Sequence, residues 1–198
     1  MTPVNEVFSG FGDRSVVGPL DISELRDLRP LHDFGSIRVP NRADLAIRLE
    51  VEETTGSVIA VSIDIAGSNV QLQAFAAPRY EGLWNEIRAS LAESIAAQGG
   101  KVIDRVGSFG AELIAELPTQ GETGVTIANR HLKFVGVDGP RWFLRIVVSG
   151  AALADPAASG AVDDVIRGLV VNRGDTPMPP RDLLPLVVPA GAAPIARS

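Results

Sequence analysis

The chain has 198 residues, of which 45% are hydrophobic and 21% charged, and this length suffices for one well-formed core or at most two small ones. Its formal net charge of −6 argues against a nucleic-acid-binding protein, because such proteins usually carry an excess of basic residues. The absence of cysteine excludes disulfides, thiolate metal sites and cysteine nucleophiles.

The start of the chain carries no targeting signal that we recognise. Residues 1–6 have neither the basic segment nor the apolar stretch of a secretory signal. No run of about 18 apolar residues occurs, so no membrane span is predicted. We therefore expect a soluble, cytoplasmic protein.

Residues 1–35 show no persistent hydrophobic period, and we expect a leader that wraps around the domain or stays mobile. Residues 22–28 are predicted to form about two helical turns within it. The next three segments, 45–52, 59–65 and 70–76, alternate apolar and polar positions. That period of two predicts strands of a sheet with one wet face, and the short links between them predict an antiparallel meander.

A helix is predicted next, because apolar residues recur at three- and four-residue spacing and Gly99-Gly100 supplies a stop. Its apolar stripe consists of Leu83, Trp84, Ile87, Leu91 and Ile95. We interpret Trp84 as a core residue.

More strands are predicted at 101–106, at 112–117, within 125–137 as one long or two short strands, and at 141–148. Asp138-Gly139 indicates a hairpin turn, and Pro140 should open the following strand at its edge. Trp142 is on the same side of this predicted strand as Leu144 and Ile146, so it is predicted to face the core.

Asp155-Pro156 begins a second predicted helix, and a short strand is expected over 169–173. Residues 175–198 form a proline-rich tail whose backbone must be extended. The stretch 181–189 is too apolar for a solvated linker. Either it packs across its own domain, which we favour, or it docks into another protein.

These elements predict an α+β fold with a mostly antiparallel sheet and two main helices packed on one face. We divide the chain into a leader (1–35), a single α+β domain (36–174) and the tail (175–198). Strand, turn, strand and helix occur twice in order, which raises a degenerate duplication of 45–100 and 101–174 as one hypothesis. Recurring αβ order within a single domain is the alternative, and we favour it.

Several longer motifs are specific. They include Leu72–Arg79, Gly82-Leu83-Trp84, the Gly-Pro-Arg-Trp-Phe-Leu-Arg stretch of 139–145, and Pro179-Pro180-Arg181-Asp182. On these motifs the chain resembles an actinobacterial family of uncharacterised cytoplasmic proteins, known as a domain of unknown function, over about residues 18–189. The resemblance implies no activity and supplies no catalytic residue.

The remaining residues give little sign of catalytic chemistry. The two histidines, His32 and His131, have no neighbouring pattern of a base or metal ligand, and Asp163-Asp164 is interpreted as a solvated helix face. Residues 107–110 lack the pattern of a phosphate-binding loop. We predict no catalytic, metal-binding or cofactor-binding residue and no cofactor.

Arg141 and Arg145 lie about 13 Å apart on one predicted strand face. Such arginines usually pair with carboxylates on adjacent strands; the alternative is a patch for an anionic ligand or partner. Arg79 and Arg181 lie in motifs off the strands, and pairing with Asp182 or another acidic neighbour is the alternative for Arg181. These four arginines are the candidate binding residues.

Two functional classes follow. The first is a non-enzymatic protein-interaction or adaptor module, with a protein partner or a second copy of the chain, and with no nucleic acid or membrane involved. The alternative is a binder or enzyme for a small anionic ligand that uses Arg141 and Arg145. A pocket with convergent polar groups would favour the second class, and a flat face with an exposed apolar patch the first.

Overall fold

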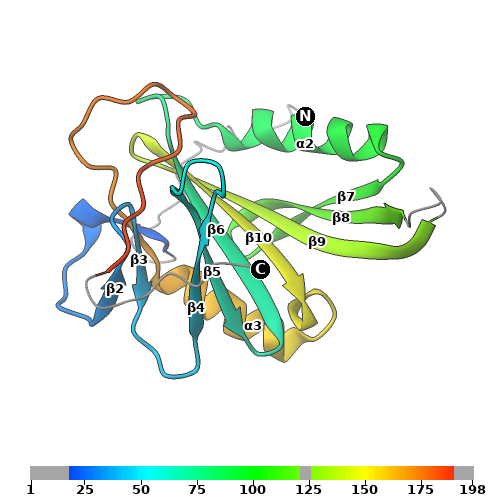
Figure 1. The fold of residues 1–198 in the computed structure, drawn as a ribbon, viewed down its shortest axis with the longest axis horizontal. Helices are drawn as coiled ribbons and strands as arrows, with labels where there is room; N and C mark the ends of the chain where they lie inside the picture. Colours follow the sequence, from blue (N-terminus) through cyan, green and yellow to red (C-terminus); the bar gives the residue numbers. More distant parts are fainter. Residues whose placement is uncertain (1–17, 121–125, 190–198) are drawn as a thin grey trace, which may run out of the picture.

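The computed structural model of the chain describes residues 18–120 and 126–189. Its main feature is a seven-stranded sheet with the strand order β4-β5-β6-β10-β9-β8-β7, in which every neighbouring pair is antiparallel (Figure 1). The strands are β4 (Ala46–Val51), β5 (Val58–Ile65), β6 (Ser68–Ala76), β7 (Lys101–Gly107), β8 (Gly110–Gln120), β9 (Thr126–Gly139) and β10 (Trp142–Gly150). The predicted α+β class with a mostly antiparallel sheet is confirmed.

The predicted meander is present as β4, β5 and β6. The β5–β6 turn pairs Ile65 with Ser68, and its two central residues, Ala66 and Gly67, have φ angles of 47° and 71°. Positive φ at both positions gives a turn whose twist matches that of the flanking strands. The segment predicted as one or two strands within 125–137 is one long strand, β9.

Two main helices are also present, α2 (Trp84–Ala97) and α3 (Pro156–Gly168). The prediction that both pack on one face of the sheet is wrong. α3 packs with Trp142, Leu144 and Ile146 of β10, whereas α2 packs with Phe143 and Val147 of the same strand. Since successive strand residues point to opposite faces, the helices cover opposite faces, as Figure 1 shows. β10 lies at the centre of the sheet and carries apolar side chains on both faces, with Arg145 among those on the α2 face.

Two contacts from the β9–β10 hairpin fix the position of α2. The Asp138 carboxylate accepts hydrogen bonds from the backbone N–H groups of Leu83, at 2.7 Å, and Trp84, at 3.2 Å, which begin the helix. Gly136 has no side chain, and a Cβ there would overlap the Trp84 ring. The helix therefore approaches the sheet closely at its N-terminal end, and Trp84 is buried as predicted.

A second, smaller sheet has the order β1-β11-β3-β2, with β1 parallel to β11. Its strands are β1 (Leu20–Asp21), β2 (Leu31–Asp33), β3 (Ile37–Pro40) and β11 (Val170–Val171). Residues 18–35 of the predicted leader thus contribute two strands, while residues 1–17 lie outside the described part of the chain. The two-turn helix predicted at 22–28 is wrong. Only the 3₁₀ turn η1 (Ile22–Glu24) forms in this segment: a capping box from Asp21 begins it, and it ends because Leu25 is already extended.

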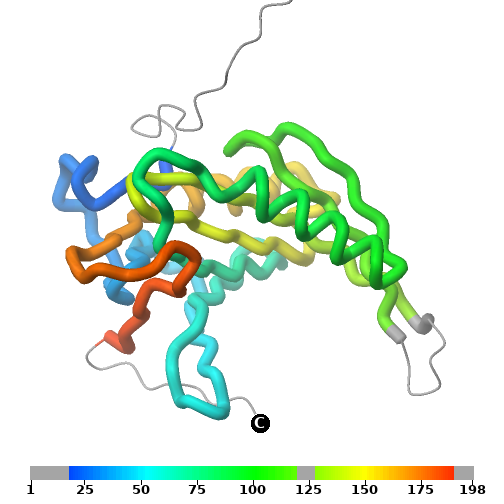
Figure 2. Tube along the Cα trace, turned by 90° about the horizontal axis from the view of Figure 1, so that it is seen from above, coloured from blue at the N-terminus to red at the C-terminus, as the bar shows by residue number. Residues whose placement is uncertain are grey.

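The tail docks on its own chain. β5 pairs with β6 only as far as Leu72. Beyond that point the tail takes over the free edge of β6: Leu184 N–H donates to the Ala74 carbonyl and Ala76 N–H donates to the Asp182 carbonyl, both at 2.8 Å. Leu184 is fully buried, and Val187 N–H reaches the Phe34 carbonyl at 3.0 Å. The favoured alternative for the tail is confirmed, and Figure 2 shows this segment next to the small sheet.

Candidate functional site

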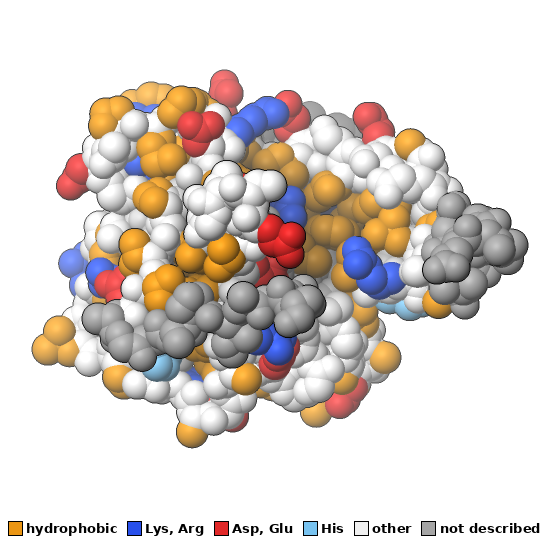
Figure 3. Space-filling view, in the orientation of Figure 1, with side chains coloured by type: hydrophobic (Ala, Val, Ile, Leu, Met, Phe, Trp, Pro, Cys, Tyr) orange, Lys and Arg blue, Asp and Glu red, His pale blue; other side chains and the backbone are white. Residues whose placement is uncertain are grey.

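The sheet face under α2 is divided into an apolar and a polar part. α2 packs over β8, β9 and β10. The register carries the same face across β6, β5 and β4, where polar side chains dominate. These are Glu50, Arg48, Ser62, Asp64, Asn69, Gln71 and Gln73. This is the wet face that the alternation predicted. Below α2, Figure 3 shows a hollow with hydrophobic side chains on its floor and charged ones at its rim.

A cavity of about 220 Å³ runs along α2 and is lined by Glu86, Ile87, Ser90, Leu91 and Arg181. Ile87 and Leu91 pack against the same hydrophobic cluster as Phe75 of β6 and Val147 of β10. We call this region the α2 groove. It comprises the cavity residues together with Arg145 and Gln73 on the same face of the sheet, which do not themselves line the cavity.

Arg145 lies between Phe143 and Val147 on β10 and is opposite Gln73 on β6. It is half-buried, and within the described residues its guanidinium has neither a hydrogen bond nor an ion pair. Its Nε is fully buried, and burial lowers the pKa of the guanidinium. By contrast, Arg48 on the same face pairs with Asp64 at 2.5 Å. Arg145 therefore carries the desolvation cost of a buried charge without a compensating partner.

Gln73 is the neighbour of Arg145 across the strands. Its Nε2 donates to the Ile59 carbonyl at 3.1 Å, and its Oε1 is buried without a hydrogen-bond partner. Gln71, two residues before it, donates to the Glu50 carboxylate at 2.6 Å. The groove thus holds one unpaired buried donor beside one unpaired buried acceptor.

The other three candidate arginines lie elsewhere. Arg141 is exposed in the β9–β10 turn with a φ of 62°, so the prediction that it shares a strand face with Arg145 is wrong. The strand begins one residue later, since Pro140 and Arg141 form the turn. Arg79 is exposed in the loop after β6. Arg181 is exposed and pairs with Glu86, an acidic neighbour as the alternative predicted, though not with Asp182.

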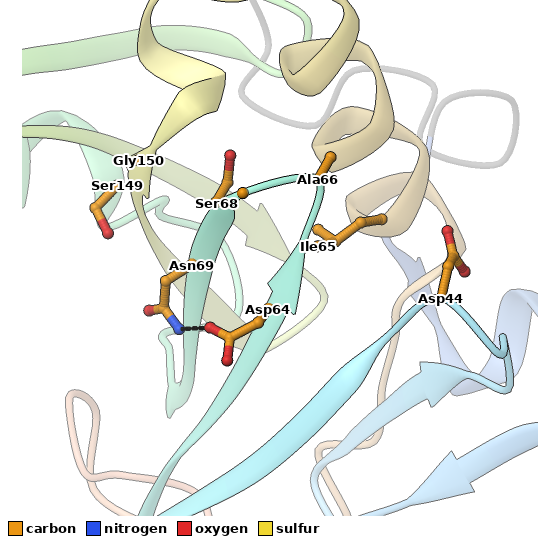
Figure 4. A pocket seen from close by; sticks show the side chains of 9 residues that line it. Asp44, Asp64, Ile65, Ala66, Ser68, Asn69, Ser149 and Gly150 are labelled. Atoms are coloured by element: carbon orange, nitrogen blue, oxygen red, sulfur yellow. Dashed lines mark hydrogen bonds between the residues drawn. The ribbon is translucent and has the colours of Figure 1, made fainter.

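A second, larger cavity of about 510 Å³ lies at the β5–β6 turn (Figure 4). Asn69 Nδ2 donates to the Asp64 carboxylate at 2.7 Å, and Asp64 also pairs with Arg48. Ser68 Oγ accepts a hydrogen bond from Ala152 N–H at 2.8 Å. Arg42 binds the Asp44 carboxylate and lowers its pKa through a hydrogen bond. The polar groups of this cavity are thus paired with groups of the protein itself.

Sequence reasoning missed two buried charged side chains, Glu112 and Lys133, and the half-buried Gln73. Glu112 and Lys133 are almost fully buried, and Glu112 pairs with Arg105. Lys133 lies on the same side of β9 as the core residues Val135 and Val137, and this alternation could have predicted that Lys133 is buried. Gln73 gave no such signal, because it lies on the polar face.

The described residues contain neither a candidate metal site nor a candidate membrane-spanning helix. They hold no cluster of three or more histidine, cysteine, aspartate or glutamate side chains suited to a metal ion. His131 is exposed, as predicted, and His32 is half-buried. None of the described helices has the length and apolar character needed to cross a membrane.

Comparison with other proteins gives a family and no activity. No curated protein sequence matches the chain, and no solved structure matches it. One family model covers residues 18–194, which is most of the chain and includes the strands, helices and groove described above. The chain therefore belongs to the family described as Protein of unknown function (DUF3710).

Proposed function

We propose that the protein is a non-enzymatic binding module whose α2 groove takes the anionic group of a small ligand on Arg145. The observation that carries this proposal is the half-buried guanidinium of Arg145, which has no partner among the described residues. A guanidinium offers donors in a planar fork that matches a carboxylate or phosphate. An anion in the groove would supply the missing acceptor and offset the desolvation cost.

The other groups of the groove are suited to binding rather than to reaction. Ile87 and Leu91 form an aliphatic wall, and the same face of the sheet carries the amide of Gln73, whose oxygen is buried. The carboxylate of Glu86 is already paired with Arg181. A guanidinium and an amide do not exchange protons near neutral pH, so these groups favour the non-enzymatic class.

The size of the cavity limits the ligand. A volume of about 220 Å³ equals that of about seven water molecules at roughly 30 Å³ each. A small carboxylate or phosphate compound fits this volume.

The test is isothermal titration of the full chain with succinate and, separately, with inorganic phosphate. We expect at least one of them to bind the wild-type protein and binding to fall at least tenfold in Arg145→Gln. Arg48→Gln is the matched control, because Arg48 lies on the same face but is paired with Asp64. Equal binding by wild type and Arg145→Gln, or no binding of either anion, would contradict the proposal.

A protein-interaction role is the second candidate, and edge strand β7 favours it. Ile103 and Val106 of this strand are 66% and 85% exposed, and β7 lies at one end of the sheet order, where no described strand pairs with its outer edge. Exposed edges of this kind can pair with a strand of another chain. As part of these proposals we place the protein in the cytoplasm, with a protein partner or a second copy of itself as the occupant of this edge.

Light scattering after size exclusion tests self-association at this edge. Val106→Glu should reduce any dimer fraction, whereas Val187→Glu, at another exposed aliphatic residue, should not. A purely monomeric wild-type protein at high concentration would rule out the second copy as occupant.

A further inference from the structure

We infer that two copies of the chain associate through edge strand β4, which pairs antiparallel with its counterpart about a two-fold axis at Leu49. β4 ends the large sheet on the side opposite β7, and none of the described strands pairs with its outer edge. The inference goes beyond the proposed binding of anions and does not depend on it. It also concerns a different edge from β7, so different variants test the two edges.

The outer edge of β4 is open for such pairing. In a strand that is paired on one side only, every second residue points its N–H and C=O groups away from the neighbouring strand. Within the described part of the chain, the backbone hydrogen bonds of residues 46–51 go to β5 alone. Figure 2 shows the β4–β5 hairpin projecting from the body of the molecule, so a second copy can approach this edge.

β4 lacks the features that usually keep edge strands from pairing. Natural edges are blunted by prolines, bulges or repelling charges. β4 contains no proline, and the irregularity in its pairing after Glu50 inserts the extra residue, Ile59, into β5. β4 itself therefore has no extra residue between Ala46 and Val51, and its alternation continues over its whole length.

This alternation restricts the registers that a two-fold axis allows. Successive side chains point to opposite faces, so residues that lie opposite each other in a continuous sheet must point to the same face. The axis must then pass through a residue position rather than between two. An axis at Arg48 would place two arginines opposite each other, and an axis at Glu50 two glutamates, both of which are destabilising. An axis at Leu49 avoids both.

The register centred on Leu49 is complementary on both faces of the sheet. On the α2 face, Arg48 of each copy lies opposite Glu50 of the other, which gives two ion pairs. On the other face, Leu49 meets its counterpart and Ile47 lies opposite Val51. These three aliphatic side chains are half-buried in one copy, so pairing would remove more of their apolar surface from water.

The contacts that Arg48 and Glu50 make within one copy are compatible with these pairs. Arg48 binds Asp64 at 2.5 Å, yet its side chain is 44% exposed, and a guanidinium has five N–H donors. Glu50 accepts a hydrogen bond from Gln71 at 2.6 Å, and a carboxylate has about four acceptor sites. Both charges can thus bind a partner across the edge and keep the contact in their own copy.

Charge reversal tests this register by sedimentation velocity of the full chain. Wild type is expected to dimerise reversibly. Arg48→Glu or Glu50→Arg alone places like charges opposite each other twice, so each should weaken the dimer at least tenfold. The double variant Arg48→Glu/Glu50→Arg restores opposite charges across the axis and should regain the dimer. It still lacks the pair with Asp64, so the recovery cannot come from repair of the single copy.

A cysteine at the axis tests the register a second way, because the chain has no cysteine of its own. Directly opposite residues on paired strands have Cβ atoms roughly 4.5–5.5 Å apart, close to the separation that a disulfide spans. Leu49→Cys should therefore form a disulfide-linked dimer with the mild oxidant diamide. Ile47→Cys is the matched control on the same face, since its two copies would lie roughly 13 Å apart along the strands.

Four outcomes would overturn the inference. The first is a wild-type protein that stays monomeric at high concentration, and the second is a dimer that both single reversals leave unchanged. The third is equal disulfide formation by Leu49→Cys and Ile47→Cys, which would place the axis elsewhere. The fourth is a dimer that is lost in Val106→Glu but kept in Arg48→Glu, which would place the contact on β7.

Discussion

The two faces of the large sheet use their side chains differently. On the α3 face, Trp142, Leu144, Ile146 and Val148 of β10 are all fully buried in one hydrophobic cluster. On the α2 face the same strand alternates Phe143 and Val147 with Arg145, an unpaired charge. The first face stabilises the fold, whereas the second gives up stability at one point. That difference marks Arg145 as a residue whose presence folding alone does not explain.

The largest effect should come from breaking the α3 face. Trp142→Ala would leave a cavity in the core and remove the hydrogen bond from the indole Nε1 to the Asp21 carboxylate, which spans 2.8 Å and links the two sheets. We expect a loss of about 3–5 kcal/mol in the free energy of unfolding. Urea denaturation measures it. A midpoint equal to that of wild type would show that this face is not the core.

Leu184→Ala tests the tail, the segment that joins the edge of β6 to the small sheet. Leu184 is fully buried in the same cluster as the α3 face. A loss of about 2–4 kcal/mol is expected from the cavity. Hydrogen exchange should also become faster at the Leu184 N–H, which bonds to Ala74. Val188→Ala, at a more exposed tail position, is the control and should change little. Similar results for both variants would contradict the docked tail.

Arg145→Met should raise the free energy of unfolding, whereas the two preceding substitutions lower it. Replacing an unpaired buried charge with an apolar side chain of similar length removes a desolvation cost, so stability should rise by about 1 kcal/mol. Thermal unfolding without added anions measures it. A clear decrease would mean that Arg145 has a structural partner in solution, and the contrast between the two faces would then be lost.

The smallest effect is expected at Arg48, which lies on the α2 face but is paired and largely exposed. Arg48→Gln breaks its ion pair with Asp64, and exposed pairs of this kind contribute about 0.2–1 kcal/mol. Adding 0.5 M NaCl to wild type should remove most of that contribution through screening. A loss above about 2 kcal/mol would show that the polar part of the face is structurally as important as the apolar part.

Local patterns predicted the parts of the fold that depend on nearest neighbours. The alternation of β4, β5 and β6 gave their antiparallel pairing, and Asp138-Gly139 gave the hairpin. Trp142 was assigned to the core from parity alone. The hypothesis of an internal duplication stays a prediction, because no relation between the two halves is tested by these contacts.

Other features depended on which distant segments meet. Phe143 and Val147 lie on the same side of the strand as Arg145, and no local pattern indicated that α2 covers that side. Arg141 was predicted to lie on a strand because the residues that follow it have a strand-like pattern. In the structure it lies in the β9–β10 turn with a positive φ. The apolar residues of the tail predicted that it is buried. Only the structure showed that it is buried along the free edge of β6.

The sequence by itself therefore determined the strands of the large sheet, its two main helices, the antiparallel pairing and the need to bury the tail. Hydrophobic period and turn chemistry act over a few residues and can be read along the chain. Only the tertiary structure decided which face each helix covers and that Arg145 and Gln73 lie side by side without partners. Burial and hydrogen-bond satisfaction depend on groups contributed by segments far apart in the chain, and no local pattern encodes them.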